Sequence, residues 1–203
     1  MITTIDVSKE YKKRSILNSI NVQINENEIT IITGESGKGK TTLLNVLSFV
    51  DKPDSGTISI DNEIPRNNRQ IMELRRHKIS HIFQNYGLID EYTVEKNLEL
   101  SMKYRKSNKM PISEALRKVG MAGFEKNRIY QLSGGEQQRV ALARTLLRDT
   151  KYIFADEPTG NLDRNNRDLV MGILKDLANN GKGIIMATHD LELLSYGDQI
   201  INL

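Results

Sequence analysis

The chain has 203 residues, of which 38% are hydrophobic and 27% are charged, a composition that suits one globular unit with a sizeable core. Its net charge of +3 arises from 29 basic and 26 acidic residues spread along the chain, so no general nucleic-acid-binding role is expected. The sequence has no cysteine, which excludes disulfides and thiolate metal sites, and no apolar run approaches the ~18 residues of a membrane helix. We therefore expect a cytosolic protein.

Strands and helices are expected to alternate from the N-terminus. Alternating apolar residues predict half-exposed strands over Ile2–Val7 and Val22–Ile24, and the β-branched run Glu28–Thr33 predicts a buried strand. The sequence TTLLNVLSFV, which begins at Thr41, then has helical periodicity. A turn over Pro53–Gly56 leads into a short alternating strand, TISI.

The second half of the chain continues this pattern after another helix-like stretch. A strand is expected over Ile79–Phe83, followed by an almost wholly helical region from Asp90 to about Asp149 that breaks at Met110-Pro111. Strands return at Tyr152–Asp156 and Gly183–Thr188, with a helix between them, and the chain closes with the strand DQIINL. This order predicts an α/β fold with a parallel sheet, an antiparallel flank and a helical insert.

A phosphate-binding loop is the clearest motif. The sequence GESGKGKT (Gly34–Thr41) fits G-x-x-x-x-G-K-[ST], and it lies between an expected buried strand and an expected helix. The backbone N–H groups of such a loop surround phosphates, while Lys40 reaches the outer phosphates and Thr41 offers its hydroxyl to Mg²⁺. On its own, the loop indicates only a nucleoside triphosphate.

A second motif, YIFADEP (Tyr152–Pro158), is an apolar strand that ends in two carboxylates. We expect Asp156 to hold the Mg²⁺ and Glu157 to take a proton from the attacking water. Two solvated acids at a strand end are the ordinary alternative. Because the pair follows a buried strand in a chain with a phosphate loop, the catalytic interpretation is preferred.

The sequence QLSGGEQQR (Gln131–Arg139) places two glycines where a helix is expected to begin. Ser133 and Glu136 have the S-x-x-E spacing of a capping box, which explains those two residues but not the glycines. A glycine-lined helix N-terminus also suits an anion, because its free N–H groups and the helix dipole favour negative charge. We therefore interpret this segment as a second phosphate-binding surface.

Three further polar residues have a functional and an ordinary interpretation. Gln84 follows a strand and could reach metal or water, or it could be an ordinary polar loop residue. His189 could bond a terminal phosphate or simply lie beside a helix cap, and Asp163 could be no more than the N-cap of the next helix. His77 and His81 are four residues apart, but the intervening sequence contains no glutamate and reads as strand entry, so no metal site is expected there.

Taken together, these residues and their order resemble the ATP-binding subunit of an ABC transporter over essentially the whole chain. By this resemblance, the segments correspond to an adenine-stacking aromatic (Tyr11), Walker A (GESGKGKT), the Q-loop (Gln84), the signature (LSGGEQQR), Walker B (YIFADE), the D-loop (NLD, Asn161–Asp163) and the switch histidine (His189).

The resemblance implies a P-loop NTPase fold with a RecA-like core, in which residues 1–86 and 150–203 form the catalytic core with its β subdomain and residues 87–149 form a helical signature subdomain. It also implies an ATPase that uses Mg²⁺. The expected catalytic residues are Glu157, His189, Lys40 and Gln84. The expected metal ligands are Thr41, Gln84 and Asp156. The expected nucleotide contacts are Tyr11, Gly34, Glu35, Ser36, Gly37, Lys38, Gly39, Lys40, Thr41, Thr42, Ser133, Gly134, Gly135 and Asp163.

The same resemblance explains the second phosphate-binding surface. In the family, Ser133 and the glycines after it face the γ-phosphate that a second copy of the chain binds, so two chains sandwich two ATP molecules. A separate transmembrane permease is the other implied partner. It would hold the subunit at the inner face of the cell membrane.

A narrower resemblance rests on DEPTGNLD and QLSGGEQQRVALAR. They are similar to the branch that contains the lipoprotein-release, macrolide-export and antimicrobial-peptide-export ATPases, together with the ATPase associated with cell-division septation. Export of a peptide, above all a bacteriocin-type peptide, or of a lipid-like substrate is therefore preferred. The alternative is a non-transport ATPase that acts on a membrane-bound cell-wall or division regulator.

Two features depart from the family pattern. Lys38 stands where relatives usually have a small residue, and it could add positive charge near the phosphates. The sequence ends at Leu203, soon after its last strand, so we expect no C-terminal regulatory domain and a membrane subunit on a separate chain.

The permease is expected to dock on the segment Asn85–Val94, which directly follows Gln84. Its apolar residues Tyr86, Leu88 and Ile89 bracket a glycine and precede two acids, as in a loop surface with an apolar patch. The alternative is that they belong to the subunit's own core.

Other classes of ATPase fit less well. A P-loop GTPase would need an N-K-x-D segment, and NKMP (Asn108–Pro111) lacks the aspartate. A nucleotide kinase would not need LSGGE. A DNA-repair ATPase of related fold would separate the phosphate loop and the signature by a long coiled coil, and the sequence contains no such heptad run.

Overall fold

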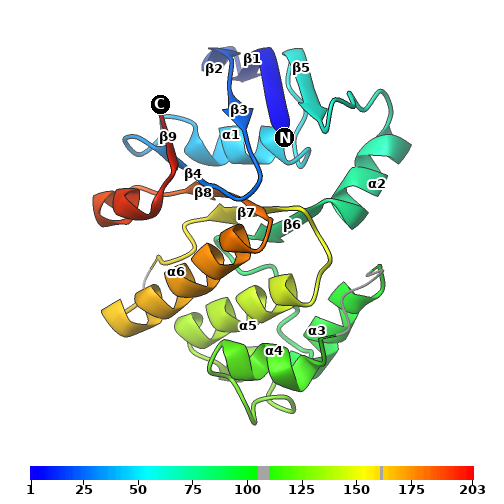
Figure 1. Ribbon diagram of the computed structural model, residues 1–203, viewed down its shortest axis with the longest axis vertical. Coiled ribbons are helices and arrows are strands. Elements are labelled where there is room, and N and C mark those ends of the chain that lie inside the picture. Colours follow the sequence, from blue (N-terminus) through cyan, green and yellow to red (C-terminus); the bar gives the residue numbers. More distant parts are fainter. Residues whose placement is uncertain (105–109, 161) are drawn as a thin grey trace.

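Figure 1 shows a computed structural model of the protein, in which residues 1–104, 110–160 and 162–203 are described. Within these residues, four strands form an antiparallel sheet near the N-terminus: β1 (Ile2–Tyr11), β2 (Arg14–Ile20), β3 (Gln23–Ile24) and β5 (Ser55–Ile60). β1 pairs with each of the other three strands. This sheet is the antiparallel flank that the sequence predicts.

A second sheet is wholly parallel and has the order β6-β7-β8-β4-β9. Its strands are β4 (Ile29–Thr33), β6 (Ile79–Ile82), β7 (Tyr152–Asp156), β8 (Gly183–Ala187) and β9 (Gln199–Asn202). The carboxyl ends of parallel strands meet at one edge of a sheet, which is where α/β proteins bind ligands. The strands predicted at each of these positions are confirmed.

The central strands of this sheet are buried on both faces, as their apolar runs predict. In β4, Ile31 packs in one hydrophobic cluster and Ile32 in another. In β7, Ile153 likewise packs in the first cluster and Phe154 in the second, because successive side chains of a strand point to opposite faces.

Helices cover both faces (Figure 1). They are α1 (Lys40–Leu47), α2 (Asn68–His77), α3 (Val94–Met102), α4 (Ile112–Lys118), α5 (Gly134–Leu146) and α6 (Arg164–Asn179). α1 lies between the two sheets, whereas α5 and α6 lie against the opposite face of the parallel sheet, with α3 and α4 beyond them. Among the described residues, none of the helices is both long and apolar enough to cross a membrane.

The sequence predicts more helix between Asp90 and Asp149 than the structure contains. Among the described residues of this region, the structure has three α-helices, α3 to α5, and an irregular stretch of residues 119–133 with one short 3-10 helix, Ile129–Gln131. Gly120 and Gly123 have φ angles of +68° and +88°, which helical residues do not adopt. Val119, Met121, Ile129 and Leu132 are nevertheless buried, and these scattered apolar residues resemble helical periodicity in the sequence.

The hairpin formed by β1 and β2 is absent from the sequence prediction. β1 extends past Val7 to Tyr11, and the chain then reverses through Lys12 and Lys13, whose φ angles are +49° and +65°. These angles suit a tight turn of the kind that joins hairpin strands. β2 follows directly and brings Ile16 beside the phosphate loop.

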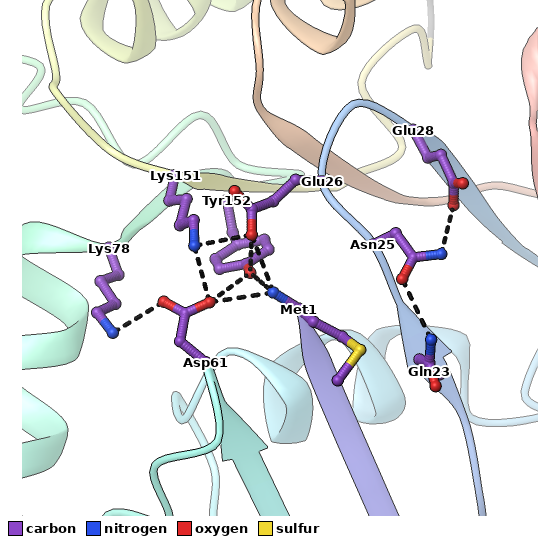
Figure 2. Close-up of polar contacts among 9 residues, drawn as sticks. All are labelled: Met1, Gln23, Asn25, Glu26, Glu28, Asp61, Lys78, Lys151 and Tyr152. Carbon is purple, nitrogen blue, oxygen red and sulfur yellow. Dashed lines mark hydrogen bonds and ion pairs between the residues drawn. The ribbon is translucent and has the colours of Figure 1, made fainter.

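A polar cluster joins the antiparallel sheet to the parallel sheet (Figure 2). At its centre, the Asp61 carboxylate accepts from Lys78 at 2.9 Å and from Lys151 at 2.8 Å. Burial by itself would raise the pKa of Asp61, but the hydrogen bonds from these two lysines hold it well below its ordinary value. The Met1 amine and the Tyr152 hydroxyl also bond to Asp61. Through these bonds, the Asp61 carboxylate holds the start of β1 against β7.

Candidate functional site

The phosphate loop connects the end of β4 to the start of α1, as predicted. Gly39 caps α1 with a left-handed backbone, φ +100°, and a Cβ atom there would lie 2.8 Å from Cγ2 of Ile16. Gly34 has φ +143°, and a Cβ atom there would lie 2.6 Å from the carbonyl oxygen of Leu203. Both positions therefore require glycine, and the loop leaves the N-terminus of α1 open to an anion.

The two lysines of the loop have different environments. Nζ of Lys40 donates to the carbonyl oxygens of Gly34 and Glu35, at 2.9 and 3.0 Å, so it lies over the loop that it closes. Nζ of Lys38 lies 3.8 Å from the Glu35 carboxylate, and both of these side chains are exposed. Lys38 thus adds a positive charge to the loop surface, and its effect on a bound nucleotide stays a prediction.

Thr41 and Asp156 lie side by side, because β7 ends beside the start of α1. The Thr41 hydroxyl donates to Oδ1 of Asp156 at 3.2 Å. Burial raises the pKa of the Asp156 carboxyl, and the Glu157 charge adds to this, while the Thr41 hydrogen bond and the Lys40 charge oppose it. The described residues contain no group of three or more His, Cys, Asp or Glu side chains that could hold a metal. The two oxygens nevertheless fit Mg²⁺, which takes one or two protein ligands together with phosphate oxygens.

Glu157 is held by the loop that follows β8. Its carboxylate lies 2.6 Å from Nδ1 of His189, accepts from the His189 backbone N–H at 3.1 Å, and accepts from the Thr188 hydroxyl at 3.1 Å. The side chain of His189 is itself 71% exposed. The structure therefore brings the two residues together, with the histidine on the solvent side of the carboxylate.

One cavity of about 1240 Å³ unites most of the predicted site residues. Its polar wall consists of residues 33–42, Gln84, Glu157, His189 and Asn202. Its apolar wall consists of Ile16, Leu191, Leu194, Ile200 and Leu203. A phosphate loop, three candidate catalytic side chains outside it and an apolar wall in one cavity suit a nucleoside triphosphate, which has a charged tail and an apolar base.

Tyr11 is not among the residues that line this cavity. Its hydroxyl donates to the Asp51 carboxylate, which raises the pKa of Tyr11 to about 12, with burial adding to the effect. Nζ of Lys9 lies 5.2 Å from the centre of the Tyr11 ring, and Tyr11 is 45% exposed. Stacking on adenine stays a prediction for Tyr11. The sequence prediction named none of the apolar wall residues. Ile16 was missed because it lies on the unpredicted strand β2.

The segment that the sequence predicts as a second phosphate-binding surface lies outside the cavity, at the exposed start of α5. The capping box is confirmed there. The Glu136 carboxylate accepts from the backbone N–H of Ser133 at 2.7 Å and from its hydroxyl at 2.8 Å, and these bonds lower the pKa of Glu136. Ser133 and Gly134 remain exposed, so another molecule can reach this helix N-terminus.

Asp163 caps α6, which was the ordinary interpretation of that residue. Its carboxylate accepts from the backbone N–H of Asn166 at 2.9 Å. A contact with nucleotide stays a prediction for Asp163. The first residue of the predicted D-loop, Asn161, lies outside the described residues.

Comparisons with known proteins agree with this site. A sequence profile described as "ABC transporter" matches residues 17–160. An uncharacterized ABC transporter ATP-binding protein of Thermotoga maritima is 38% identical, over 98% of this chain and 89% of its own. A macrolide export ATP-binding/permease protein of Chlorobaculum tepidum is 37% identical over the whole of this chain, which spans 33% of that longer protein.

The solved structures agree as well. The dimeric structure of MJ0796, a bacterial ABC transporter cassette, matches with a TM-score of 0.92 and 35% identity, over all of this chain and 94% of its own. A post-hydrolysis dimer of the same cassette, bound to ADP and Pi, matches with a TM-score of 0.91 and 34% identity, over the same shares. The fold is therefore that of an ABC ATPase cassette, and the chain belongs to the ABC transporter family as an ATP-binding protein that hydrolyses ATP.

Proposed function

We propose that two copies of this chain bind two Mg²⁺–ATP between them, head to tail, and that hydrolysis drives export through a separate transmembrane permease. The observation that carries the proposal is that the phosphate loop and the predicted second phosphate-binding segment, at the start of α5, lie apart in one chain. The cavity holds the phosphate loop and Glu157, while the start of α5 is exposed outside it. A surface that cannot serve its own cavity can complete the cavity of a second copy.

Each part of the site has a role in this proposal. The N–H groups of the loop and Lys40 hold the phosphates, and Thr41 and Asp156 hold Mg²⁺, which offsets phosphate charge. Gln84, on the cavity wall, orients water or metal. Glu157 takes a proton from the attacking water, and its bonds to the loop after β8 aim its carboxylate.

We further propose that the exported substrate is a peptide, lipoprotein or antimicrobial. Relatives that share this cassette support an export role, since a probable syringafactin export protein of Pseudomonas syringae is 39% identical over 92% of this chain. This chain spans 30% of that protein, which is described as both ATP-binding protein and permease. The chain would therefore lie at the inner face of the membrane, attached to its permease.

The permease is proposed to dock beside the segment that follows Gln84. Ile89 is 43% exposed and suits a contact surface, whereas Leu88 packs against the chain's own hydrophobic core. The expectation of an exposed apolar patch is therefore wrong for Leu88. The Tyr86 hydroxyl points toward the exposed start of α5, to 3.0 Å from where a Cβ atom of Gly134 would lie.

A groove of about 720 Å³ lies next to this segment, between α2, α3 and α5. Apolar side chains such as Ile71, Met72 and Leu100 line it together with five basic residues, and none of the described lining residues is Asp or Glu. The basic residues are Lys52, Arg75, Arg76, Arg144 and Arg148. A cytoplasmic segment of the permease with carboxylates around an apolar anchor would complement this groove.

Export can be tested in inside-out vesicles that contain the membrane protein encoded beside this chain. ATP and the purified chain should drive a labelled macrolide, lipopeptide or cationic peptide into the vesicle lumen, and Glu157→Gln should abolish that uptake. ATP hydrolysis by the complex without uptake of any of the three classes would contradict the export proposal. ATP-dependent recruitment of a cell-wall hydrolase by the same membrane protein would then support the alternative, a non-transport regulator.

A further inference from the structure

Gln138 is a buried polar residue with an unusual set of contacts. It lies on α5 and is 3% exposed. Its amide nitrogen donates to the carbonyl oxygen of Pro158 and lies 3.5 Å from the carbonyl oxygen of Glu157. Its amide oxygen is buried and has no hydrogen-bond partner in the part of the chain that the structure describes. A buried amide that is only half satisfied is costly, which points to a role other than stabilising the fold.

The backbone that Gln138 contacts has a conformation that needs support. Glu157 has a φ angle of +47°, which costs a non-glycine residue of order 1–3 kcal/mol unless its surroundings hold it. Its N–H donates to Ala187 at 2.9 Å, and its carbonyl oxygen accepts from Gly160 at 3.0 Å. The amide of Gln138 adds a donor on the far side of the same turn. This turn sets the direction in which the Glu157 carboxylate leaves the backbone.

The same helix carries the second phosphate-binding surface. Ser133 caps α5, and Gln138 lies five residues further along, about 7 Å along the helix axis. Two neighbouring features connect the first half of α5 to the residues that follow Glu157. Gly135 lies so close to Leu162 that a Cβ atom on it would be 3.1 Å away, and Arg139 donates to the Asn166 side chain at 2.5 Å.

We propose that Gln138 is a positioning residue for Glu157. By holding the turn at Glu157 and Pro158, it fixes the catalytic carboxylate from the helix that begins at Ser133. A ligand that engages the start of α5 therefore also acts on the orientation of the base in the same chain. This inference rests on the proposed role of Glu157 as general base.

The direct test replaces the amide by an apolar group of similar length. Gln138→Met removes both the donor to the turn and the unpartnered acceptor, so the fold is expected to survive. We expect kcat for ATP to fall about 10- to 100-fold, because a base displaced by about 1 Å costs that much, while KM stays within about 2-fold. A purely structural role would lower the melting temperature and leave kcat of the folded fraction unchanged.

Thr145→Val is the matched control, because Thr145 is another buried polar residue of α5 and lies outside the segment Gln131–Arg139. Its hydroxyl donates to the carbonyl oxygen of Ala141 at 3.2 Å, and none of its hydrogen bonds in the described structure reaches Glu157. This variant is expected to keep kcat within about 2-fold of the parent. A loss of kcat as large as that of Gln138→Met would overturn the inference. Gln138→Leu provides a second apolar variant in case the methionine variant does not fold.

A double-mutant cycle separates a route through Glu157 from an independent effect. In the Glu157→Gln background, single-turnover hydrolysis should change by less than about 2-fold when Gln138→Met is added. The same 10- to 100-fold loss in both backgrounds would overturn the inference. Normal turnover in Glu157→Gln alone would instead remove the proposed base. Failure of this inference can thus be distinguished from failure of the proposed function.

Discussion

The Glu157 carboxylate is oriented by hydrogen-bond donors in the loop that follows β8. The Thr188 hydroxyl and the backbone of His189 bond to its carboxylate, so the base is oriented before any substrate binds. Pre-orientation of this kind is what a general base requires, because proton transfer depends on geometry before it depends on acidity.

The Glu157→Gln variant tests this role directly. The amide keeps the size of the side chain but cannot accept the proton, so kcat should fall about 10²- to 10⁴-fold while ATP binding persists. ATP hydrolysis and ATP binding can be measured on the same preparation. A sizing column should also show an ATP-dependent dimer, since trapped ATP would hold two chains together. Normal turnover in this variant would exclude Glu157 as the base.

Tyr11 provides a second test at this scale. If its ring stacks on adenine, Tyr11→Ala should weaken ATP binding by about 1 kcal/mol, and Tyr11→Trp should be mild. Tyr11→Phe should also be mild for ATP, but it loses the bond to Asp51 and should lower the melting temperature as Asp51→Asn does. If Tyr11→Ala and Tyr11→Trp instead lower the melting temperature equally and leave ATP binding per folded molecule unchanged, Tyr11 serves packing alone.

His81 should make stability depend on pH. It is stacked between Phe83 and Phe154, and burial together with the charges of nearby arginines lowers its pKa from 6.5 to about 3. Between these two values the unfolded chain binds a proton that the folded chain does not, so stability falls as the pH falls through this window. The free energy of unfolding should be about 2 kcal/mol lower at pH 5 than at pH 7 on account of His81.

Urea unfolding at pH 7, 6 and 5 measures this effect. His81→Phe should flatten the pH dependence, because phenylalanine keeps the stack without the proton. His77→Phe is the control, since His77 is paired at the surface with Glu73. An unchanged pH dependence in His81→Phe would contradict the assignment.

The residues of the site were predictable where a motif fixes both the residue type and its place. The loop from Gly34 to Thr41 and the pair Asp156 and Glu157 follow apolar runs, and parallel strands bring such ends to one edge. Ile16 and Gln138 were not predictable in this way. Ile16 looks like any strand residue, and the contact between Gln138 and Pro158 joins positions 20 residues apart across two elements.

At the scale of elements, buried strands were predictable and local reversals were not. β4, β7 and β8 are short β-branched or apolar runs that are buried on both faces, and no other element suits them. The turn between β1 and β2 uses Lys12 and Lys13, whereas such turns favour asparagine and glycine. The helical region was overestimated because four apolar residues of the irregular stretch, Val119, Met121, Ile129 and Leu132, are buried as the apolar face of a helix would be.

The segment after β6 carries the prediction on docking. Ile89→Glu should leave the isolated subunit folded and able to bind ATP, and it should abolish co-purification with the permease. Leu88→Glu should lower the melting temperature instead, because Leu88 packs against the core. Ile5→Glu, at an exposed position on β1, is the control and should not affect co-purification. Normal assembly of the Ile89→Glu variant would place the docking surface elsewhere.

At the scale of the whole molecule, one hydrophobic cluster runs from the parallel sheet into α3, α4 and α5. It contains Ile153 of β7 together with Leu98, Leu116 and Leu142 of the three helices. Although this cluster is shared, we propose that residues 87–149 act as the signature subdomain. This subdomain would rotate relative to the core formed by residues 1–86 and 150–203. The contacts of Arg144 with the carbonyl oxygens of Tyr86 and Gly87 would link the two parts.

The composite nucleotide site is the central claim, and mixing two inactive variants tests it most directly. Lys40→Ala disables the phosphate loop of one chain, and Ser133→Arg disables the start of α5 in the other. In a head-to-tail dimer of the two, one site contains both defects and the other contains neither. A 1:1 mixture should therefore hydrolyse ATP at about a quarter of the parent rate, because half of the dimers are mixed and each has one intact site. Hydrolysis that stays at the level of the separate variants, with both shown to be folded, would contradict a site shared between two chains.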